Sequence, residues 1–224
     1  IHSEGVFEPF ANEIEDGRDT TEWIVEQGWA NGRIGTWGGS YDGYTAMAAA
    51  VDNDLVSAVM ADDSPPDLSF DIQGGVLGLH LLSWRYLLDH QDWMPEAITG
   101  TATNTLDLTT LDNLILGYDD FLLTDFLVAQ HPDAEYFESR GIRERFDQIC
   151  APTFMVVSFS NGVMLPIWQA VVDSDCNRDS DERHFMFVTP DEHCEHMGYV
   201  MDGSTEVASL MMDFIDHYVG ERDV

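Results

Sequence analysis

The sequence has 224 residues, of which 44% are hydrophobic, and this suits one globular domain with an insertion. Its 42 acidic residues outnumber its 9 basic residues, so the formal net charge is −33, and a surface this acidic excludes nucleic acid and anionic membranes as partners. No apolar run approaches the roughly 18 residues that a membrane-spanning helix needs.

Strands and helices are predicted to alternate along most of the chain. Patterns typical of buried strands occur at residues 33–38, 55–64, 151–160 and 183–190. Helical patterns occur at residues 16–28, 44–53, 166–175 and 204–220, and Asp19 or Thr20 is expected to cap the first of these helices. This order predicts the α/β class, with a parallel sheet that carries helices on both faces.

Residues 65–146 interrupt this alternation. They contain apolar segments at helical spacing, such as GLHLLSWRYLLDH and DDFLLTDFLVAQ, separated by polar stretches. We expect a helical lid here, inserted into a core that residues 1–64 and 147–224 form. The lid is expected to shape the acyl or leaving-group pocket, whereas core packing is the expected role of each single aromatic side chain in it, such as Trp84, Tyr86, Trp93 and Phe121.

Composition also bears on the environment of the protein. All nine basic residues are arginine, and an acid excess without lysine resembles proteins of halophilic archaea, so folding and activity should weaken together below about 1 M salt. The three cysteines, Cys150, Cys176 and Cys194, show no framework spacing, and their odd number argues against a disulfide scaffold, so we expect Cys150 to be a buried apolar group. No signal peptide is visible at the start of the sequence, so we expect a cytoplasmic location. The chain begins without Met, and we expect its true N-terminus to be absent.

The segment TWGGSYDGYTAMAAA carries the strongest functional signal. A strand runs into glycines, Ser40 follows, and a helix begins at once, which is typical of the nucleophile elbow of serine hydrolases. The amide of Tyr41 would then lie at a helix N-terminus, where it can stabilise an oxyanion. The second glycine falls one place later than in the general G-x-S-x-G pattern, because Asp42 occupies that position.

The run from residue 3 to residue 52 resembles the X-prolyl dipeptidyl-peptidase and cocaine-esterase-like serine hydrolases, whose elbow reads G-x-S-Y-x-G. The later segment RHFMFVTPDEHCEHMG resembles the last core strand and histidine loop of that family. The resemblance implies an α/β-hydrolase fold, no cofactor, and hydrolysis of an ester or amide in a small molecule or short peptide. It does not separate peptidase, esterase and acylase activities.

His193 is the predicted base, because the resemblance places the catalytic histidine three residues after Pro190. His196 is the reserve candidate. The string H-C-E-H also suggests a zinc site formed by His193, Cys194 and His196. A loop lacks the helical spacing of H-E-x-x-H and no second ligand cluster is evident, so we expect no metal.

The catalytic acid stays open. The resemblance puts an aspartate after the strand PTFMVVSFS, but Asn161 stands there, and an asparagine cannot stabilise an imidazolium by charge. Asn161 could still orient His193, or Asp62 or Asp63 could serve as the acid from the end of the preceding strand. The third alternative is a catalytically impaired module that binds a ligand or partner without turnover.

The resemblance also implies that this is a partial chain. Before the part that corresponds to residue 1, related enzymes carry several strands and a tyrosine of the oxyanion hole. After the part that corresponds to the last predicted helix, they carry a jelly-roll domain. An incomplete sheet has an open edge, so a homo-oligomer or a complementing chain is expected to cover it. We therefore predict an incomplete α/β-hydrolase in which Ser40 attacks, His193 accepts its proton and Tyr41 holds the oxyanion.

Overall fold

The structure is a computed structural model and describes residues 8–67, 72–73, 76–77, 140–159, 164–177, 183–190, 193–194 and 206–220. The chain divides into two compact units, the first formed by residues 1–67 and 140–224 and the second by residues 68–139. In the second unit the structure describes only an antiparallel pair, β3 (Ile72–Gln73) and β4 (Val76–Leu77). The helices and aromatic side chains predicted for the lid lie outside the described residues.

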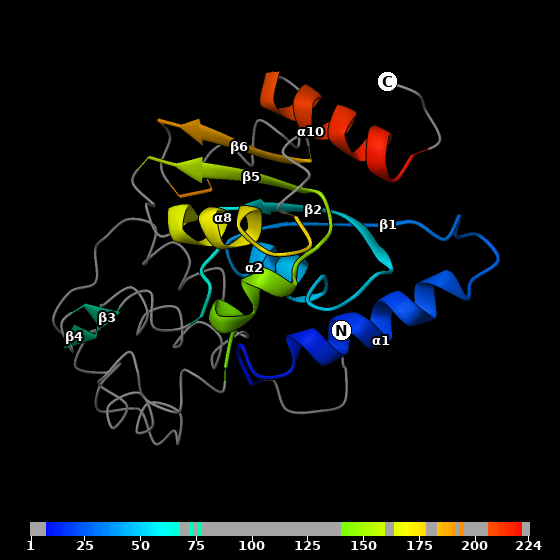
Figure 1. Ribbon diagram of the computed structural model, residues 1–224, viewed down its shortest axis with the longest axis horizontal. Coiled ribbons are helices and arrows are strands. Elements are labelled where there is room, and N and C mark those ends of the chain that lie inside the picture. Colours follow the sequence, from blue (N-terminus) through cyan, green and yellow to red (C-terminus); the bar gives the residue numbers. More distant parts are fainter. Residues whose placement is uncertain are drawn as a thin grey trace, which may run out of the picture. The chain divides into compact units, whose positions relative to one another are not determined.

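The first unit is built on a parallel sheet of four strands in the order β1-β2-β5-β6 (Figure 1). The strands are β1 (Ile34–Gly39), β2 (Val56–Asp62), β5 (Thr153–Ser158) and β6 (His184–Thr189). Each lies close to its predicted range, and the prediction of an α/β fold with a parallel sheet is confirmed. All four strands run in one direction, so the segments that follow them meet at one edge.

Helices cover both faces of this sheet. Their bounds are α2 (Tyr41–Ala48), α8 (Met164–Val172) and α10 (Glu206–Tyr218), and a 3₁₀ turn, η3, spans Arg143–Gln148. Gly35 faces α10, since an added Cβ would lie 2.9 Å from the Ile215 side chain, whereas the Thr36 hydroxyl donates to the Ala46 carbonyl of α2. Neighbouring residues of a strand point to opposite faces, so α10 and α2 lie on opposite sides.

The face under α10 holds an apolar cluster that fixes this helix. Phe154 and Val156 of β5 pack with Met211 and Phe214 of α10, and all four are buried. On the other face, Met47 of α2 and Met155 of β5 are fully buried. Burial on both faces explains why β2 and β5 are nearly continuous apolar runs.

The first helix, α1 (Glu13–Val25), begins earlier than predicted. Asn12 occupies the N-cap position, so the expected caps Asp19 and Thr20 were wrong. The Glu13 carboxylate accepts hydrogen bonds from the amides of Phe10 and Asn12, each 3.1 Å long. These hydrogen bonds hold the backbone just before α1, so the helix begins at Glu13 and not at the predicted residue 16.

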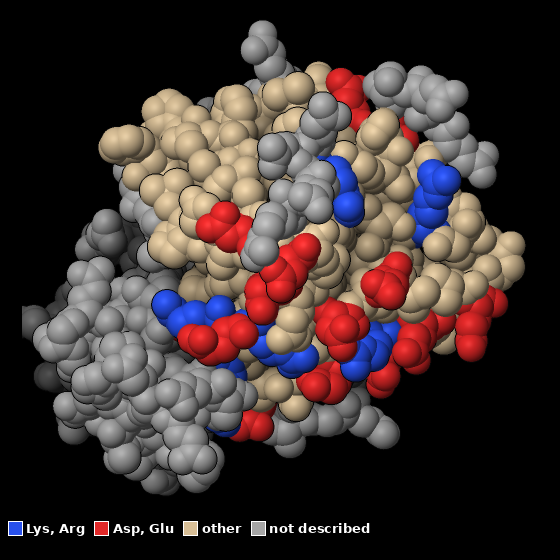
Figure 2. All heavy atoms as spheres, in the orientation of Figure 1, with Lys and Arg blue, Asp and Glu red and all other residues tan. Residues whose placement is uncertain are grey.

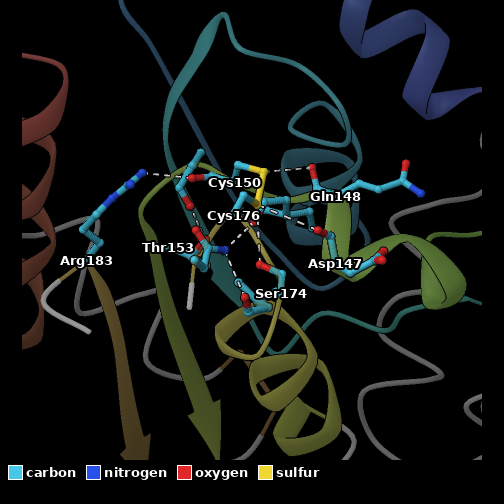
Figure 3. The surroundings of a disulfide bond; sticks show 11 residues. Asp147, Gln148, Cys150, Thr153, Ser174, Cys176 and Arg183 are labelled. Atoms are coloured by element: carbon cyan, nitrogen blue, oxygen red, sulfur yellow. Dashed lines mark hydrogen bonds between the residues drawn. A yellow bond between two sulfur atoms is a disulfide. The ribbon is translucent and has the colours of Figure 1, made fainter. Parts of the chain in front are cut away.

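The expectation of a buried apolar Cys150 was also wrong, because this residue takes part in a disulfide. Cys150 and Cys176 form one, with their Cα atoms 5.6 Å apart (Figure 3). Cys150 lies between η3 and β5, and Cys176 follows α8, so the bond ties two connections at the amino ends of the strands. The odd number of cysteines leaves Cys194 as the free thiol. Cys150 is therefore a structural cross-link and not a buried apolar thiol.

Acidic side chains are spread over the face of the molecule shown in Figure 2, with arginines between them. Several ion pairs connect the two kinds, such as Arg143 with the buried carboxylate of Asp67. Within the part of the chain that the structure describes, no helix is both long and apolar enough to cross a membrane.

Candidate active site

Ser40 lies at the sharp turn between β1 and α2. Its backbone has φ 55° and ψ −125°, a conformation that residues with a side chain rarely adopt and that costs on the order of 1–3 kcal/mol. The Ser40 amide donates to the Asp62 carbonyl over 2.8 Å, which binds the turn to the end of β2. This is the nucleophile-elbow geometry, in which the hydroxyl stands at the carboxyl edge of the sheet.

Two glycines make this turn possible. A Cβ on Gly38 would lie 2.4 Å from the backbone of Asp42, and a Cβ on Gly43 would lie 1.8 Å from the Ser64 hydroxyl oxygen. Asp42, in contrast, is exposed, so a side chain fits at the position where the general elbow has glycine. The late glycine is therefore required by the close approach of α2 to Ser64 after β2.

The base candidate lies directly against this serine. His193 Nε2 is 3.0 Å from Ser40 Oγ, although 153 residues separate the two in the sequence. His193 follows β6, so it reaches the carboxyl edge of the sheet from the outermost strand. A neutral imidazole with its lone pair on Nε2 can accept the serine proton at this distance.

Asp63 connects the histidine loop to the sheet. Its carboxylate Oδ2 accepts the Cys194 amide over 2.9 Å, and Oδ1 accepts the amide and the hydroxyl of Ser158 at 2.8 and 3.0 Å. Asp63 is 0% exposed. The buried carboxylate thus joins the ends of β2 and β5 to the residue next to His193.

Backbone strain is concentrated around these groups. Five non-glycine residues in the described part of the chain have positive φ, and Ser40, Asp63 and Cys194 are three of them. Such conformations persist only where surrounding contacts enforce them, and they cluster at functional sites. The contacts here are the hydrogen bonds from Ser40 to β2 and from Cys194 to Asp63.

Tyr41 is the first residue of α2, and its side chain fixes the elbow to the first helix. The Tyr41 hydroxyl donates to the Glu13 carboxylate and accepts the Phe10 amide, and its ring meets the Phe10 ring edge-on at 4.9 Å. Burial and the hydrogen bond to Glu13 raise the pKa of Tyr41 far above its usual value. The side chain therefore stays neutral, and the Tyr41 amide lies at the N-terminus of α2 beside Ser40.

Comparisons with known proteins agree with this geometry. Residues 1–195 match the sequence profile of the X-Pro dipeptidyl-peptidase (S15) family. The chain belongs to this family. Cocaine esterase of Rhodococcus sp. is 30% identical over 185 residues, an alignment that covers 71% of this chain and 32% of the esterase. The S15-family chain thus spans about a third of the length of this curated relative.

Solved structures show the fold of this S15-family chain. An esterase of Pyrococcus furiosus matches with a TM-score of 0.55 at 12% identity, covering 97% of this chain and 66% of the esterase. An acylaminoacyl peptidase of Pyrococcus horikoshii matches with a TM-score of 0.53 at 14% identity, covering 94% of this chain and 28% of the peptidase. The fold is that of the α/β-hydrolases, as predicted.

The structure brings together several of the candidate site residues predicted from the sequence of this S15-family chain. Ser40, Tyr41, Asp63 and His193 meet at one edge of the sheet, whereas Asn161 and His196 lie outside the described residues. Asp62 is 1% exposed, and its backbone carbonyl accepts the Ser40 amide and the Ser64 hydroxyl. The hydrogen bonds that Ser64 and Ser158 make in this site were not predicted, since a serine at the end of a strand or after it carries no distinctive pattern.

Cys194 lies beside His193, the candidate base of this S15-family site. Its Sγ is 3.8 Å from His193 Nε2. Burial, reinforced by the charges of Asp62 and Asp63, raises the pKa of the Cys194 thiol to about 12. The thiol is therefore protonated at neutral pH and is a poor nucleophile compared with a thiolate.

A cavity of about 560 Å³ lies at the other end of the sheet. The disulfide, the start of β2, Arg183 and Tyr218 help to line it. Ser40 follows the carboxyl end of β1, so this cavity is remote from the candidate nucleophile.

Proposed function

We propose that this chain carries the catalytic centre of a serine hydrolase that cleaves an ester or amide bond in a small molecule or short peptide. The distance of 3.0 Å between Ser40 Oγ and His193 Nε2, at a strained elbow, carries the proposal. Membership of the S15 family and the 30% sequence identity to cocaine esterase support the same reaction.

The chemistry follows from the positions of the groups. Ser40 attacks the substrate carbonyl while His193 Nε2 takes its proton, and the Tyr41 amide donates to the oxyanion that forms. His193 then gives the proton to the leaving alcohol or amine, which departs as the acyl-enzyme forms. A water molecule activated by His193 releases the acid and restores Ser40.

Asp63 is proposed as the carboxylate that supports the base. It holds the loop through the Cys194 amide and places a negative charge near the imidazolium that forms on His193. In the Ser-His-Asp triad, an aspartate-to-asparagine change lowers kcat strongly because the histidine loses both the negative charge and the hydrogen bond that orients it. Asp63 supplies charge and orientation in this chain, whatever part Asn161 plays.

Labelling with a fluorophosphonate tests the proposal, because the probe reacts covalently only with an activated serine. Wild-type protein should be labelled stoichiometrically, and Ser40→Ala should not be labelled. His193→Gln should be labelled at least about 10²-fold more slowly, the usual contribution of a general base. A folded wild type that resists the probe would instead favour the impaired binding module.

Paired substrates would separate the possible activities of the site. Hydrolysis of an X-Pro-anilide would support a dipeptidyl-peptidase, and hydrolysis of a short p-nitrophenyl ester would support an esterase. Both measurements belong in molar salt, since the net charge of −33 requires screening for a compact state. Equal folding and activity in dilute buffer would contradict the proposed adaptation to salt.

The setting of the protein stays a proposal as well. The cytoplasmic location stays a prediction. The Cys150–Cys176 disulfide argues against it, because disulfides persist mainly in oxidising compartments. A second copy or a complementing chain is proposed to pair with the edge of β1, whose described partner in the sheet is β2.

A further inference from the structure

We propose that Cys194, His193 and Asp63 form a binding site for a soft divalent cation, Zn²⁺ or Cd²⁺, and that its occupation stops the hydrolase. Each residue offers one ligand atom, and these three atoms lie within 4.8 Å of one another. They are a thiol, an imidazole and a carboxylate, the three side-chain types that bind zinc in proteins. Inhibition rests on the proposed role of His193 as base, whereas binding of the cation does not.

The spacing of the two strongest ligands suits a tetrahedral ion. With Zn–S and Zn–N bonds of about 2.3 and 2.0 Å, tetrahedral geometry places sulfur and nitrogen roughly 3.5 Å apart. Cys194 Sγ and His193 Nε2 are 3.8 Å apart. An ion can therefore bind both atoms with little movement of the loop.

The loop is already held where the third ligand lies. Asp63 Oδ2 accepts the Cys194 amide over 2.9 Å, and the backbone of Cys194 has φ 54°. This combination differs from the H-C-E-H string in the sequence, because Asp63 comes from the end of β2. The fold, and not the local spacing, assembles the three ligands.

Charge favours a dication at this place. Asp42, Asp62 and Asp63 all make the potential at the Cys194 thiol more negative, and the chain as a whole carries −33. Negative potential opposes a bare thiolate, but it attracts an ion that brings two positive charges. On binding, the sulfur loses its proton to solvent and forms the metal–sulfur bond, so no oxidant or reductant is needed.

Occupation would remove the base from the reaction. The Nε2 lone pair that binds the ion is the one that lies 3.0 Å from Ser40 Oγ. Once it is used for coordination, it cannot accept the serine proton, and Ser40 loses its activation. The site is thus inhibitory and is separate from any requirement for a metal in catalysis.

Direct binding can be measured without any substrate. Titration of the full chain with Cd²⁺ in potassium sulfate should produce the ultraviolet absorption of a cadmium–thiolate bond. Cys150 and Cys176 are joined as a disulfide, so this band reports Cys194 alone. Ser40→Ala should keep the band, and Cys194→Ser should lose it. A wild type without a saturable band at millimolar Cd²⁺ would overturn the proposal.

Fluorophosphonate labelling then tests inhibition, with each variant compared with its own metal-free rate. Saturating Zn²⁺ should slow wild-type labelling at least about 10-fold, and Mg²⁺, a hard cation, should have no effect. Cys194→Ser and Asp63→Asn should need at least roughly 10–100-fold more Zn²⁺, the loss typical of a perturbed metal site. Equal zinc sensitivity in wild type and Cys194→Ser would also overturn it. A cadmium band in a chain that resists the probe would leave the cation site standing and remove the proposed hydrolase.

Discussion

The Asp63 carboxylate accepts the backbone amide of Cys194 over 2.9 Å, and so fixes the residue that directly follows the proposed base. The same carboxylate holds Ser158 at the end of β5. One buried anion therefore sets the position of the His193 loop relative to the sheet from which Ser40 emerges.

Asp63→Asn should lower kcat about 10²-fold, the loss expected when a catalytic group moves by about 1 Å, while KM changes little. The side-chain amide of the variant would place an N–H group where Asp63 now accepts hydrogen bonds, either from the Cys194 backbone amide or from the amide and hydroxyl of Ser158. Substrate kinetics with wild type and variant give the separation of kcat from KM, and circular dichroism confirms folding.

Asp42→Asn is the matched control, because it removes a neighbouring exposed carboxylate that has no place in this proposed support. It should keep kcat within a factor of about two, the range of a neutral surface change. If the two asparagine variants were equally active, Asp63 would be a structural anchor without influence on the base. Ser158→Ala, which removes the hydroxyl that donates to Asp63, should give an intermediate loss.

Gly43→Ala should disturb the elbow itself. The new methyl would lie 1.8 Å from Ser64 Oγ and 2.7 Å from the Gly38 carbonyl, so α2 must shift. Overpacking of this kind costs about 1–3 kcal/mol and should also slow fluorophosphonate labelling of Ser40. Urea unfolding and the labelling rate check both effects. Asp42→Ala, one position earlier and exposed, should leave both unchanged, and a silent Gly43→Ala would contradict the close approach.

The sheet and the elbow were predictable because their signals are local. Buried parallel strands are continuous apolar runs, and GGSYDG between a strand and a helix indicates the turn at Ser40. The role of Asp63 depends on partners 95 and 131 residues away, so only the fold reveals it. Two consecutive acids, Asp62 at the end of β2 and Asp63 directly after it, marked the place in the sequence without showing which one reaches the histidine loop.

Two errors have similar causes. The start of α1 depends on the carboxylate of Glu13 and the amide of Phe10, whose ring is buried against Tyr41 and Tyr44. That anchoring is tertiary and leaves no capping pattern in the sequence. The disulfide depends on a Cα distance of 5.6 Å between Cys150 and Cys176, which no spacing rule for cysteines provides.

The disulfide should contribute to stability without taking part in the reaction. The two cysteines are 26 residues apart, and closing a loop of that length stabilises a fold by about 3.5 kcal/mol on a chain-entropy estimate. The variant with Cys150→Ser and Cys176→Ser should lose about this free energy of unfolding in urea. Dithiothreitol should destabilise wild type and Cys194→Ser alike, and it should not affect the double variant. Stability that resists dithiothreitol in every variant would mean that the bond does not constrain the chain.

His184 should make stability depend on pH. It lies on β6 and is 8% exposed, with its ring 6.3 Å from that of Trp168, and neither ring nitrogen has a hydrogen-bond partner among the described residues. Burial, assisted by the charge of Arg183, lowers the pKa of His184 to about 4. The unfolded chain, with an ordinary histidine pKa, therefore binds a proton at a higher pH than the folded chain does.

The contribution of neutral His184 to stability is complete above about pH 6.5 and is lost as the pH falls towards 4. At pH 5 the free energy of unfolding has fallen by about 2 kcal/mol on this account. Carboxylates titrate nearby in pH, so the quantity to measure is the difference between wild type and His184→Phe in urea unfolding at pH 7 and pH 5. His184→Phe should lose less stability than wild type on acidification, by about the same 2 kcal/mol. His217→Gln, which changes an exposed histidine on α10, should follow wild type. If His184→Phe also followed wild type, the ring would be protonated in the folded state at pH 5.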